Sequence, residues 1–153
     1  AALAELAHRY LAGHGPATDR DLARWAGIGL GAARAGLRAV ASRLRQVPGG
    51  LLDVRGRRRP PPAPPRLLGA FDPLLLGWAS RDAVLGPHES RVVGGGVFRP
   101  VALAGGRAVG TWSLARGRVE LAPFGSLDPA VAADLDREAA AVARFLGLPR
   151  RAP

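Results

Sequence analysis

The sequence contains no cysteine, no methionine and no lysine among its 153 residues. Without cysteine the chain cannot form disulfides or thiolate-based zinc sites, and we expect a reducing, cytoplasmic setting. Without methionine, even at position 1, we expect a fragment of a longer protein that continues on the N-terminal side. No apolar run approaches the length of about 18 residues that a membrane helix needs, and no signal-peptide pattern occurs, so we expect no membrane partner.

All 22 basic residues are arginine, and they exceed the 12 acidic residues to give a net charge of +10. GC-rich codon usage accounts for the choice of arginine over lysine but less well for its distribution. Residues 1–59 contain 11 arginines and four acids, whereas residues 60–153 contain 11 arginines and eight acids. The positive charge is therefore concentrated in the N-terminal part, where it favours a polyanion, either nucleic acid or an anionic membrane surface.

Helical periodicity predicts three short helices in the first 45 residues, over 2–12, 19–26 and 30–45. Thr18 is a typical N-cap for the second helix, with Asp21 three residues later, and Gly27 ends that helix. Leu22, Trp25 and Ala26 are expected to face inward. A glycine-containing break before the third helix indicates a helix-turn-helix.

A small hairpin is expected next, with strands at Gln46–Val47 and Leu51–Val54 joined by the turn 48–50. A helix-turn-helix followed by such a hairpin predicts a winged helix-turn-helix over residues 1–59. The arginine run that ends in Arg57, Arg58 and Arg59 is placed at or just after the tip of the wing. The proline-rich segment 60–65 is a stiff linker and the expected domain boundary.

Residues 66–149 predict a C-terminal α/β domain. It is expected to hold a short helix over 74–79, a loop over 86–96, and a three-stranded antiparallel meander over 97–104, 107–114 and 118–124. A final helix is expected to start at Asp128-Pro129 and to bury a stripe that includes Leu135 and Phe145. The predicted class is α+β: a winged helix-turn-helix followed by a small helix, three-stranded meander and helix domain.

Two arginine-rich features are the candidate DNA-binding site. Arg34, Arg38, Ser42 and Arg45 share one stripe of the third predicted helix, the helix that enters the major groove in a helix-turn-helix. The run Arg57–Arg59 is expected to lie along phosphates or to enter a minor groove. The alternatives are a solvated helix face and a disordered, solvated linker, and an arm that orders only on binding satisfies both interpretations. With about five phosphate contacts, we expect a log–log salt slope of roughly −4 to −5.

The chain shows no recognisable catalytic, metal or cofactor motif. His8, His14 and His88 lack the spacing of metal ligands and are interpreted as surface histidines. His88-Glu89-Ser90 superficially suggests a triad, but sequence neighbours rarely converge in space. Gly94–Gly96 lacks the lysine and the Ser/Thr of a phosphate-binding loop. We therefore predict no catalytic residue, no metal and no cofactor within this sequence.

Several motifs, in order along nearly the whole chain, resemble those of bacterial winged-helix DNA-binding domain proteins. They are Arg9-Tyr10-Leu11, Gly15-Pro16-Ala17-Thr18, Asp21–Gly27, Leu67–Pro73, Leu75–Trp78, Val97–Val101 and Gly106–Trp112. The sequence is especially similar to actinobacterial members of the group that includes alkylpurine and interstrand-crosslink DNA glycosylases. The resemblance implies tandem winged helices with a C-terminal β-rich part. This chain would supply the last winged helix and that part, with the upstream winged helices of the same protein as partners.

The resemblance also implies a chemistry, the removal of alkylated bases from double-stranded DNA. Glycosylases of the group carry a glutamine–x–glutamine or glutamine–x–aspartate pair toward their N-terminal side. This sequence has a single glutamine, Gln46, which is followed by Val47 and Pro48, so the pair is absent. Either the catalytic residues lie upstream or this branch only binds DNA. Two other classes stay open: a transcription regulator whose second domain senses a ligand or dimerises, and a winged helix used only for protein contact.

Overall fold

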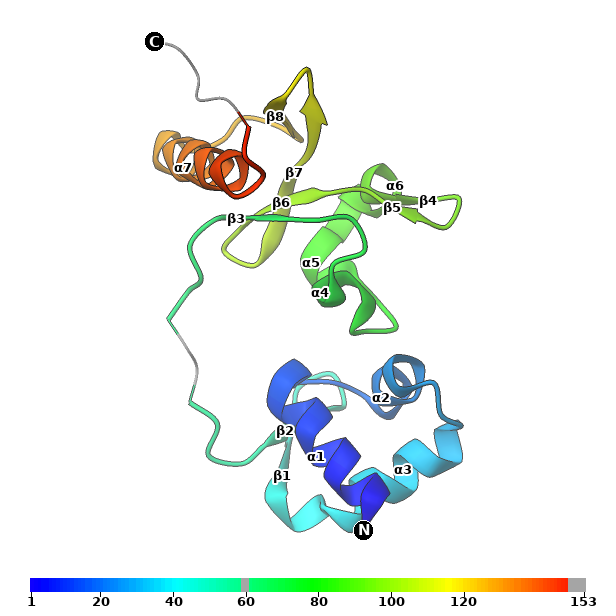
Figure 1. Cartoon of the computed structure of the whole chain (residues 1–153). Coiled ribbons are helices and arrows are strands. Elements are labelled where there is room, and N and C mark those ends of the chain that lie inside the picture. The colour runs from blue at the N-terminus through cyan, green and yellow to red at the C-terminus, as the bar shows by residue number, and fades with distance from the viewer. Residues whose placement is uncertain (59–60, 149–153) are drawn as a thin grey trace. The chain divides into compact units, whose positions relative to one another are not determined.

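The computed structural model describes residues 1–58 and 61–148, which form two compact units (Figure 1). The first unit comprises residues 1–58 together with Pro73–Ser80, and the second comprises residues 61–72 and 81–148. Helices and antiparallel sheets occur in both units, which confirms the predicted α+β class. In this part of the chain, no helix is both long enough and apolar enough to cross a membrane.

Three helices open the first unit: α1 (Ala2–His14), α2 (Asp19–Ala26) and α3 (Leu30–Ala39), coloured blue to cyan in Figure 1. The predicted bounds of α2 are confirmed. The Thr18 side chain accepts a hydrogen bond from the Asp21 backbone N–H, and the Asp21 carboxylate accepts one from the Thr18 N–H in return. Gly27 ends the helix in the left-handed region, at φ +63°. α1 continues through Gly13 to His14, beyond its predicted end.

The third helix is shorter than predicted, because α3 ends at Ala39 and residues 40–45 are not α-helical. A 3-10 turn, η1 (Ala41–Arg43), leads into the strand β1 (Leu44–Val47). Leu44 fits a helical stripe by its spacing, but it is paired with Val54 in the hairpin, and the Arg55 N–H donates to the Arg43 carbonyl. Strand pairing, which a helical period cannot reveal, therefore decides where the helix ends.

The predicted hairpin is present as β1 and β2 (Leu51–Val54), an antiparallel pair in the register Leu44↔Val54 to Val47↔Leu51. Gly49 and Gly50 form its tip, with φ values of +82° and +71° that favour glycine. Two backbone hydrogen bonds between Ala17 and Leu52 attach the α1–α2 connection to the hairpin. The register corrects one prediction, since Arg55 follows the base of the hairpin and not its tip.

The segment Pro73–Ser80, including α4 (Pro73–Leu76), belongs to the first unit, although the sequence placed it in the second domain. Hydrogen bonds to residues of α1 and α2 attach it there. The Tyr10 hydroxyl donates to the Gly77 carbonyl at 2.8 Å, and the Trp78 indole N–H donates to the His14 carbonyl at 3.1 Å. The Ala79 N–H donates to the Asp21 carboxylate at 2.7 Å.

An aromatic cluster accompanies these bonds and overturns two predictions. His14 stacks on Tyr10 with ring centroids 5.0 Å apart, and its ring also meets Trp25 and Trp78. The His14 Nδ1 atom is buried and the residue is half-buried, so this histidine is part of the packing and not a freely exposed surface group. Trp25, expected to face inward, covers the cluster from outside and remains 43% exposed. Burial and the nearby Asp21 carboxylate raise the pKa of Tyr10 well above its usual value.

The second unit contains more regular structure than the predicted meander. A four-stranded antiparallel sheet has the order β3-β6-β7-β8, and a two-stranded ladder joins β4 to β5. The strands are β3 (Arg66–Leu68), β4 (Val93–Gly94), β5 (Val97–Phe98), β6 (Val101–Ala104), β7 (Arg107–Ala115) and β8 (Arg118–Pro123). The single strand predicted over 97–104 is wrong, because it is divided at Arg99-Pro100, where proline lacks the N–H that a ladder needs.

Short helices lie between β3 and β4 in the chain, and one long helix follows β8. They are α5 (Asp82–Leu85), the 3-10 helix η2 (Gly86–His88), α6 (Glu89–Val92) and α7 (Pro129–Phe145). The loop predicted over 86–96 is therefore largely structured. Asp128 caps α7, and Leu135 is fully buried in a cluster with Leu67 and Ala102 of the sheet. The expected burial of Phe145 is wrong, since this side chain at the end of α7 is 89% exposed.

Candidate nucleic-acid interface

A shallow cavity of about 290 Å³ lies between the start of α2, the outer face of α3 and the β1–β2 hairpin. We call it the α3 groove. Its lining combines two arginines, one carboxylate and one amide with small or apolar groups: Asp19, Arg34, Leu37, Arg38, Gln46, Gly50 and Leu52. Two predicted site residues, Arg34 and Arg38, are thus brought together in one concave surface.

Arg34 is held in the groove by an ion pair. Its Nε–H donates to Asp19 Oδ2 at 2.6 Å, while its side chain stays 52% exposed. Only Nε makes this bond, and neither terminal nitrogen has a hydrogen-bond partner within residues 1–58 and 61–148. The hydrogen bond and charge of Arg34 lower the pKa of Asp19, so the pair is ionised at neutral pH.

Arg38 lies one helical turn after Arg34, in the last turn of α3, and is exposed. No carboxylate of the described residues pairs with it. Its complete fork of guanidinium donors therefore faces solvent at the edge of the groove, as a phosphate or base contact requires.

Ser42 and Arg45 do not continue the stripe, because α3 has already ended. Ser42 is exposed on η1, and Arg45 lies on β1 opposite Asp53 of β2. Arg45 Nη2 donates to Asp53 Oδ2 at 2.7 Å, and the Asp53 side chain is only 5% exposed. The geometry therefore gives Arg45 a structural role inside the hairpin.

The Arg57 side chain also makes contacts within the protein. Its Nη1 donates to the carbonyls of Leu11 and Gly15, at 3.1 and 2.7 Å, and lies 3.6 Å from Asp53 Oδ1. Gly15 makes room for it, since a Cβ there would lie 3.0 Å from the Arg57 guanidinium and 2.5 Å from the Leu11 carbonyl oxygen. Arg57 therefore binds one carbonyl in the last turn of α1 and the carbonyl of its C-cap residue.

The other two arginines of the run 57–59 are Arg58 and Arg59. Arg58 is exposed, and no ion pair to it occurs within the described part of the chain. Arg59 lies outside the described residues. Contact between this run and a phosphate backbone stays a prediction, and for Arg57 the internal hydrogen bonds favour a structural role.

Asp53 forms ion pairs with both Arg45 and Arg57. Burial raises its pKa, but the hydrogen bonds from Arg45 and the Val54 N–H, with the charges of Arg45 and Arg57, outweigh burial and lower the pKa overall. A buried carboxylate with a lowered pKa stays charged at neutral pH and offsets one of the two positive charges beside it. Less of the positive charge of this region is therefore free than its composition suggests.

Two polar residues of the α3 groove were not predicted from the sequence. Asp19 was assigned only to the start of a helix, and it precedes Arg34 by 15 positions, a spacing with no local signal. Gln46 was noted only as a lone glutamine, yet it lines the groove from β1. Exposed arginines outside the predicted stripe were also missed: Arg20, Arg24, Arg43 and Arg55.

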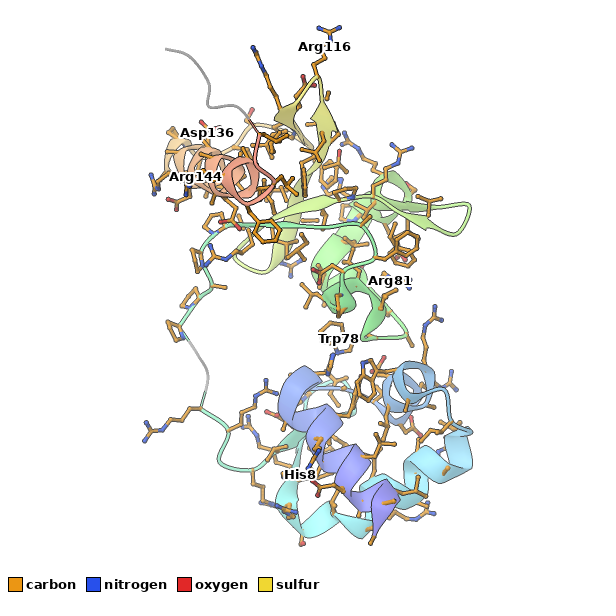
Figure 2. The ribbon with its side chains drawn as sticks, viewed as in Figure 1. His8, Trp78, Arg81, Arg116, Asp136 and Arg144 are labelled. Carbon is orange, nitrogen blue, oxygen red and sulfur yellow. The ribbon has the colours of Figure 1, made fainter. Side chains whose placement is uncertain are left out.

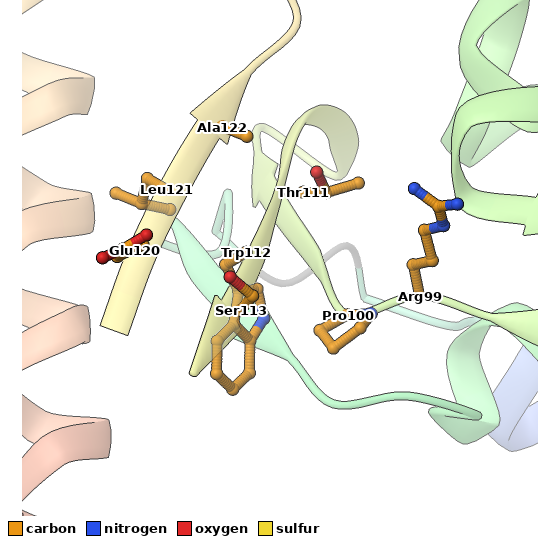
Figure 3. Close-up of a pocket in the computed structure, with 8 residues that line it drawn as sticks. All are labelled: Arg99, Pro100, Thr111, Trp112, Ser113, Glu120, Leu121 and Ala122. Carbon is orange, nitrogen blue, oxygen red and sulfur yellow. The ribbon is translucent and has the colours of Figure 1, made fainter. Parts of the chain in front are cut away.

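A second cavity, of about 350 Å³, opens beside the sheet of the second unit (Figure 3). Arg99 and Pro100 line one side, and β7 and β8 residues, including Thr111 and Glu120, line the other. Arg116 extends from the tip of the β7–β8 hairpin (Figure 2). Within the described residues no three His, Asp or Glu side chains gather as metal ligands. This cavity combines no set of groups with a recognisable chemistry.

Comparison with known proteins gives concordant results. The family model described as "DNA glycosylase AlkZ-like" matches residues 1–145. An interstrand DNA cross-link repair glycosylase from Streptomyces sahachiroi is 30% identical over 161 residues, covering 92% of this chain and 42% of that protein. The solved structure of the Streptomyces sahachiroi DNA glycosylase AlkZ superposes with a TM-score of 0.82 and 28% identity over 97% of this chain and 44% of its own.

The chain thus spans less than half the length of the relatives that it matches. The resemblance to crosslink glycosylases inferred from the sequence motifs is confirmed, and so is the relation of the mixed α+β fold to theirs. From the match over residues 1–145, the chain belongs to the DNA glycosylase AlkZ-like family.

Proposed function

We propose that this chain is a double-stranded DNA-binding part of a DNA-repair protein of the glycosylase type. The observation that carries the proposal is the α3 groove, where two arginines present unpaired terminal nitrogens beside an exposed helix face and a hairpin. Family membership supports DNA as the polyanion. The matched relatives are repair glycosylases, which favours repair over the alternative of a transcription regulator.

The proposed interface is a winged helix-turn-helix made by residues 1–59, with α3 as the helix that faces the duplex and β1–β2 as the wing. A linker over 60–65 and a C-terminal α/β domain over 66–149 complete the scheme, and Pro73–Ser80 braces the first unit. Upstream winged-helix domains of the same cytoplasmic protein would extend the contact with DNA. Arg34 and Arg38 are the principal contacts, and Arg58 and Arg59 are secondary ones.

The exposed face of α3 also bears on whether the protein recognises a particular DNA base sequence. Apart from its two arginines, this face carries Gly31 and Ala39, and neither side chain can donate or accept a hydrogen bond. Base-specific readout needs donors and acceptors at the groove edge. We therefore propose that binding is largely independent of sequence and comes mainly from phosphate contacts.

Base excision is not proposed for this chain alone. The glutamine pair implied by the resemblance is absent from its sequence, and the only glutamine, Gln46, is followed by Val47 and Pro48. The proposed role is to hold the duplex while residues elsewhere in the protein carry out the chemistry. An alkylated duplex incubated with the chain should give no abasic product above the buffer rate.

Fluorescence anisotropy with a labelled duplex of about 20 base pairs tests the binding proposal. Arg34 and Arg38 supply two clear phosphate contacts, so we expect a log–log salt slope of about −2, shallower than the sequence alone suggested, and about −4 when Arg58 and Arg59 also contact phosphates. Arg38→Glu should weaken binding at least tenfold. Arg144→Glu is the matched control, because Arg144 is also an exposed arginine in the last turn of a helix. Equal losses in both variants would contradict the proposed interface.

A further inference from the structure

We propose that Asp19 is a positioning residue that holds Arg34 by its inner nitrogen, so that the two terminal nitrogens are presented to one DNA phosphodiester. This inference rests on the proposed function and assigns different roles to two residues of the α3 groove. Asp19 does not contact DNA in this scheme. It fixes the direction of the guanidinium group that does.

The atoms used in the ion pair carry the argument. A guanidinium group has five N–H donors in a planar fork, and a phosphate is bound best by two parallel donors. The 2.6 Å bond to Asp19 uses only the donor at Nε. Both terminal nitrogens therefore remain available, on a side chain that is 52% exposed.

Two other arginines of the first unit show the opposite arrangement. Arg45 uses its terminal Nη2 to bind Asp53, and Arg57 uses its terminal Nη1 to bind two backbone carbonyls. In both residues a terminal nitrogen is therefore occupied by a partner within the protein. Among the arginines of residues 1–58 and 61–148, only Arg34 combines a place in the α3 groove with a carboxylate held at its inner nitrogen.

The carboxylate itself has a well-defined position. Asp19 is the first residue of α2, directly after Thr18, whose reciprocal hydrogen bonds with Asp21 fix the start of the helix. Its side chain is 27% exposed, less than that of its partner. A fixed acceptor restricts the rotamers of a long, flexible side chain, so less motion is lost when Arg34 binds a phosphate.

Two variants with the same charge separate positioning from electrostatics. Asp19→Asn and Asp19→Ala both remove one negative charge, which strengthens any polyanion binding equally. The asparagine carbonyl can still accept the bond from Arg34 Nε, whereas alanine cannot. Anisotropy titrations of the whole chain with a 20-base-pair duplex should show Asp19→Ala binding about threefold to tenfold more weakly than Asp19→Asn.

The same comparison in an Arg34→Ala background gives the second readout. If Asp19 acts through Arg34, the two variants should then bind within twofold of each other, even if they differ in the stability of α2. Glu5 supplies the matched control, because its carboxylate holds Arg9 Nε at 2.6 Å on α1, away from the residues that line the groove. Glu5→Gln and Glu5→Ala should bind DNA equally.

Equal binding by the Asp19→Asn and Asp19→Ala variants would overturn the inference, as would a difference that persists without Arg34. A difference of the same size between the two Glu5 variants would also overturn it. Failure of the proposed function is distinguishable, because the unmodified chain would then show no salt-dependent binding to the duplex at all.

Discussion

Replacing Arg57 with alanine tests whether this residue belongs to the DNA-binding surface or to the fold. Its Nη1 donates to two carbonyls at the end of α1 and lies close to the buried Asp53 carboxylate. Arg58→Ala is the matched control, because it removes the same charge from an exposed neighbour. The two variants have the same effect on net charge and very different effects on internal hydrogen bonds.

The magnitude follows from the contacts that alanine would remove. Hydrogen bonds with a charged partner each contribute about 1.5–3 kcal/mol, and those of Arg57 are discounted because its side chain is 30% exposed and water can replace part of the contact. We expect Arg57→Ala to lower the free energy of unfolding by about 2 kcal/mol, and Arg58→Ala to change it by less than about 0.5 kcal/mol.

Urea denaturation followed by tryptophan fluorescence measures this difference, because Trp25 and Trp78 both lie in the first unit. With a urea dependence of about 1–3 kcal/mol per molar, the midpoint of Arg57→Ala should fall by roughly 1 M. Duplex affinity at a temperature where both variants are folded should fall no more for Arg57→Ala than for Arg58→Ala. Unchanged stability together with a selective loss of DNA binding would refute the structural role of Arg57.

Two further predictions concern the first unit. Gly36→Ala should lower the free energy of unfolding by about 1 kcal/mol despite the better helix propensity of alanine, because the new Cβ would lie 2.5 Å from the Leu3 carbonyl oxygen. Gly31→Ala, on the same helix with nothing within 4 Å, should be neutral or stabilising in the same urea titration. The free energy of unfolding should also fall as the pH drops below about 4, because the lowered pKa of Asp53 makes the unfolded chain bind its proton first. Above that pH the contribution of Asp53 to the free energy of unfolding is complete. Asp53→Asn should therefore be less stable at pH 6, and its free energy of unfolding should fall less between pH 6 and pH 3.

The controls decide between these explanations and simpler ones. Equal destabilisation by Gly36→Ala and Gly31→Ala would show that the close approach of α1 and α3 is not what matters. The same acid dependence in the unmodified chain and in Asp53→Asn would assign the acid transition to other carboxyl groups, such as Asp19, whose pKa is also lowered.

Local chemistry in the sequence was sufficient for the elements whose ends are marked by nearby residues. Thr18, Asp21 and Gly27 define α2 within ten positions, and the glycine turn defines the hairpin that follows α3. Such signals act between residues close in the chain, so they can be read without a structure. Motifs in order along the chain likewise indicated the family, which the comparisons confirm.

Only the tertiary structure decided which arginines are free. Asp53 binds Arg45 across two strands, and Arg57 reaches back 46 positions to the end of α1. Asp19 of α2 forms an ion pair with Arg34 of α3. A charge count records each guanidinium group as one positive charge, but its ability to bind a phosphate depends on which of its nitrogens already have partners. That is settled by contacts between elements, because packing brings together groups that the chain keeps apart.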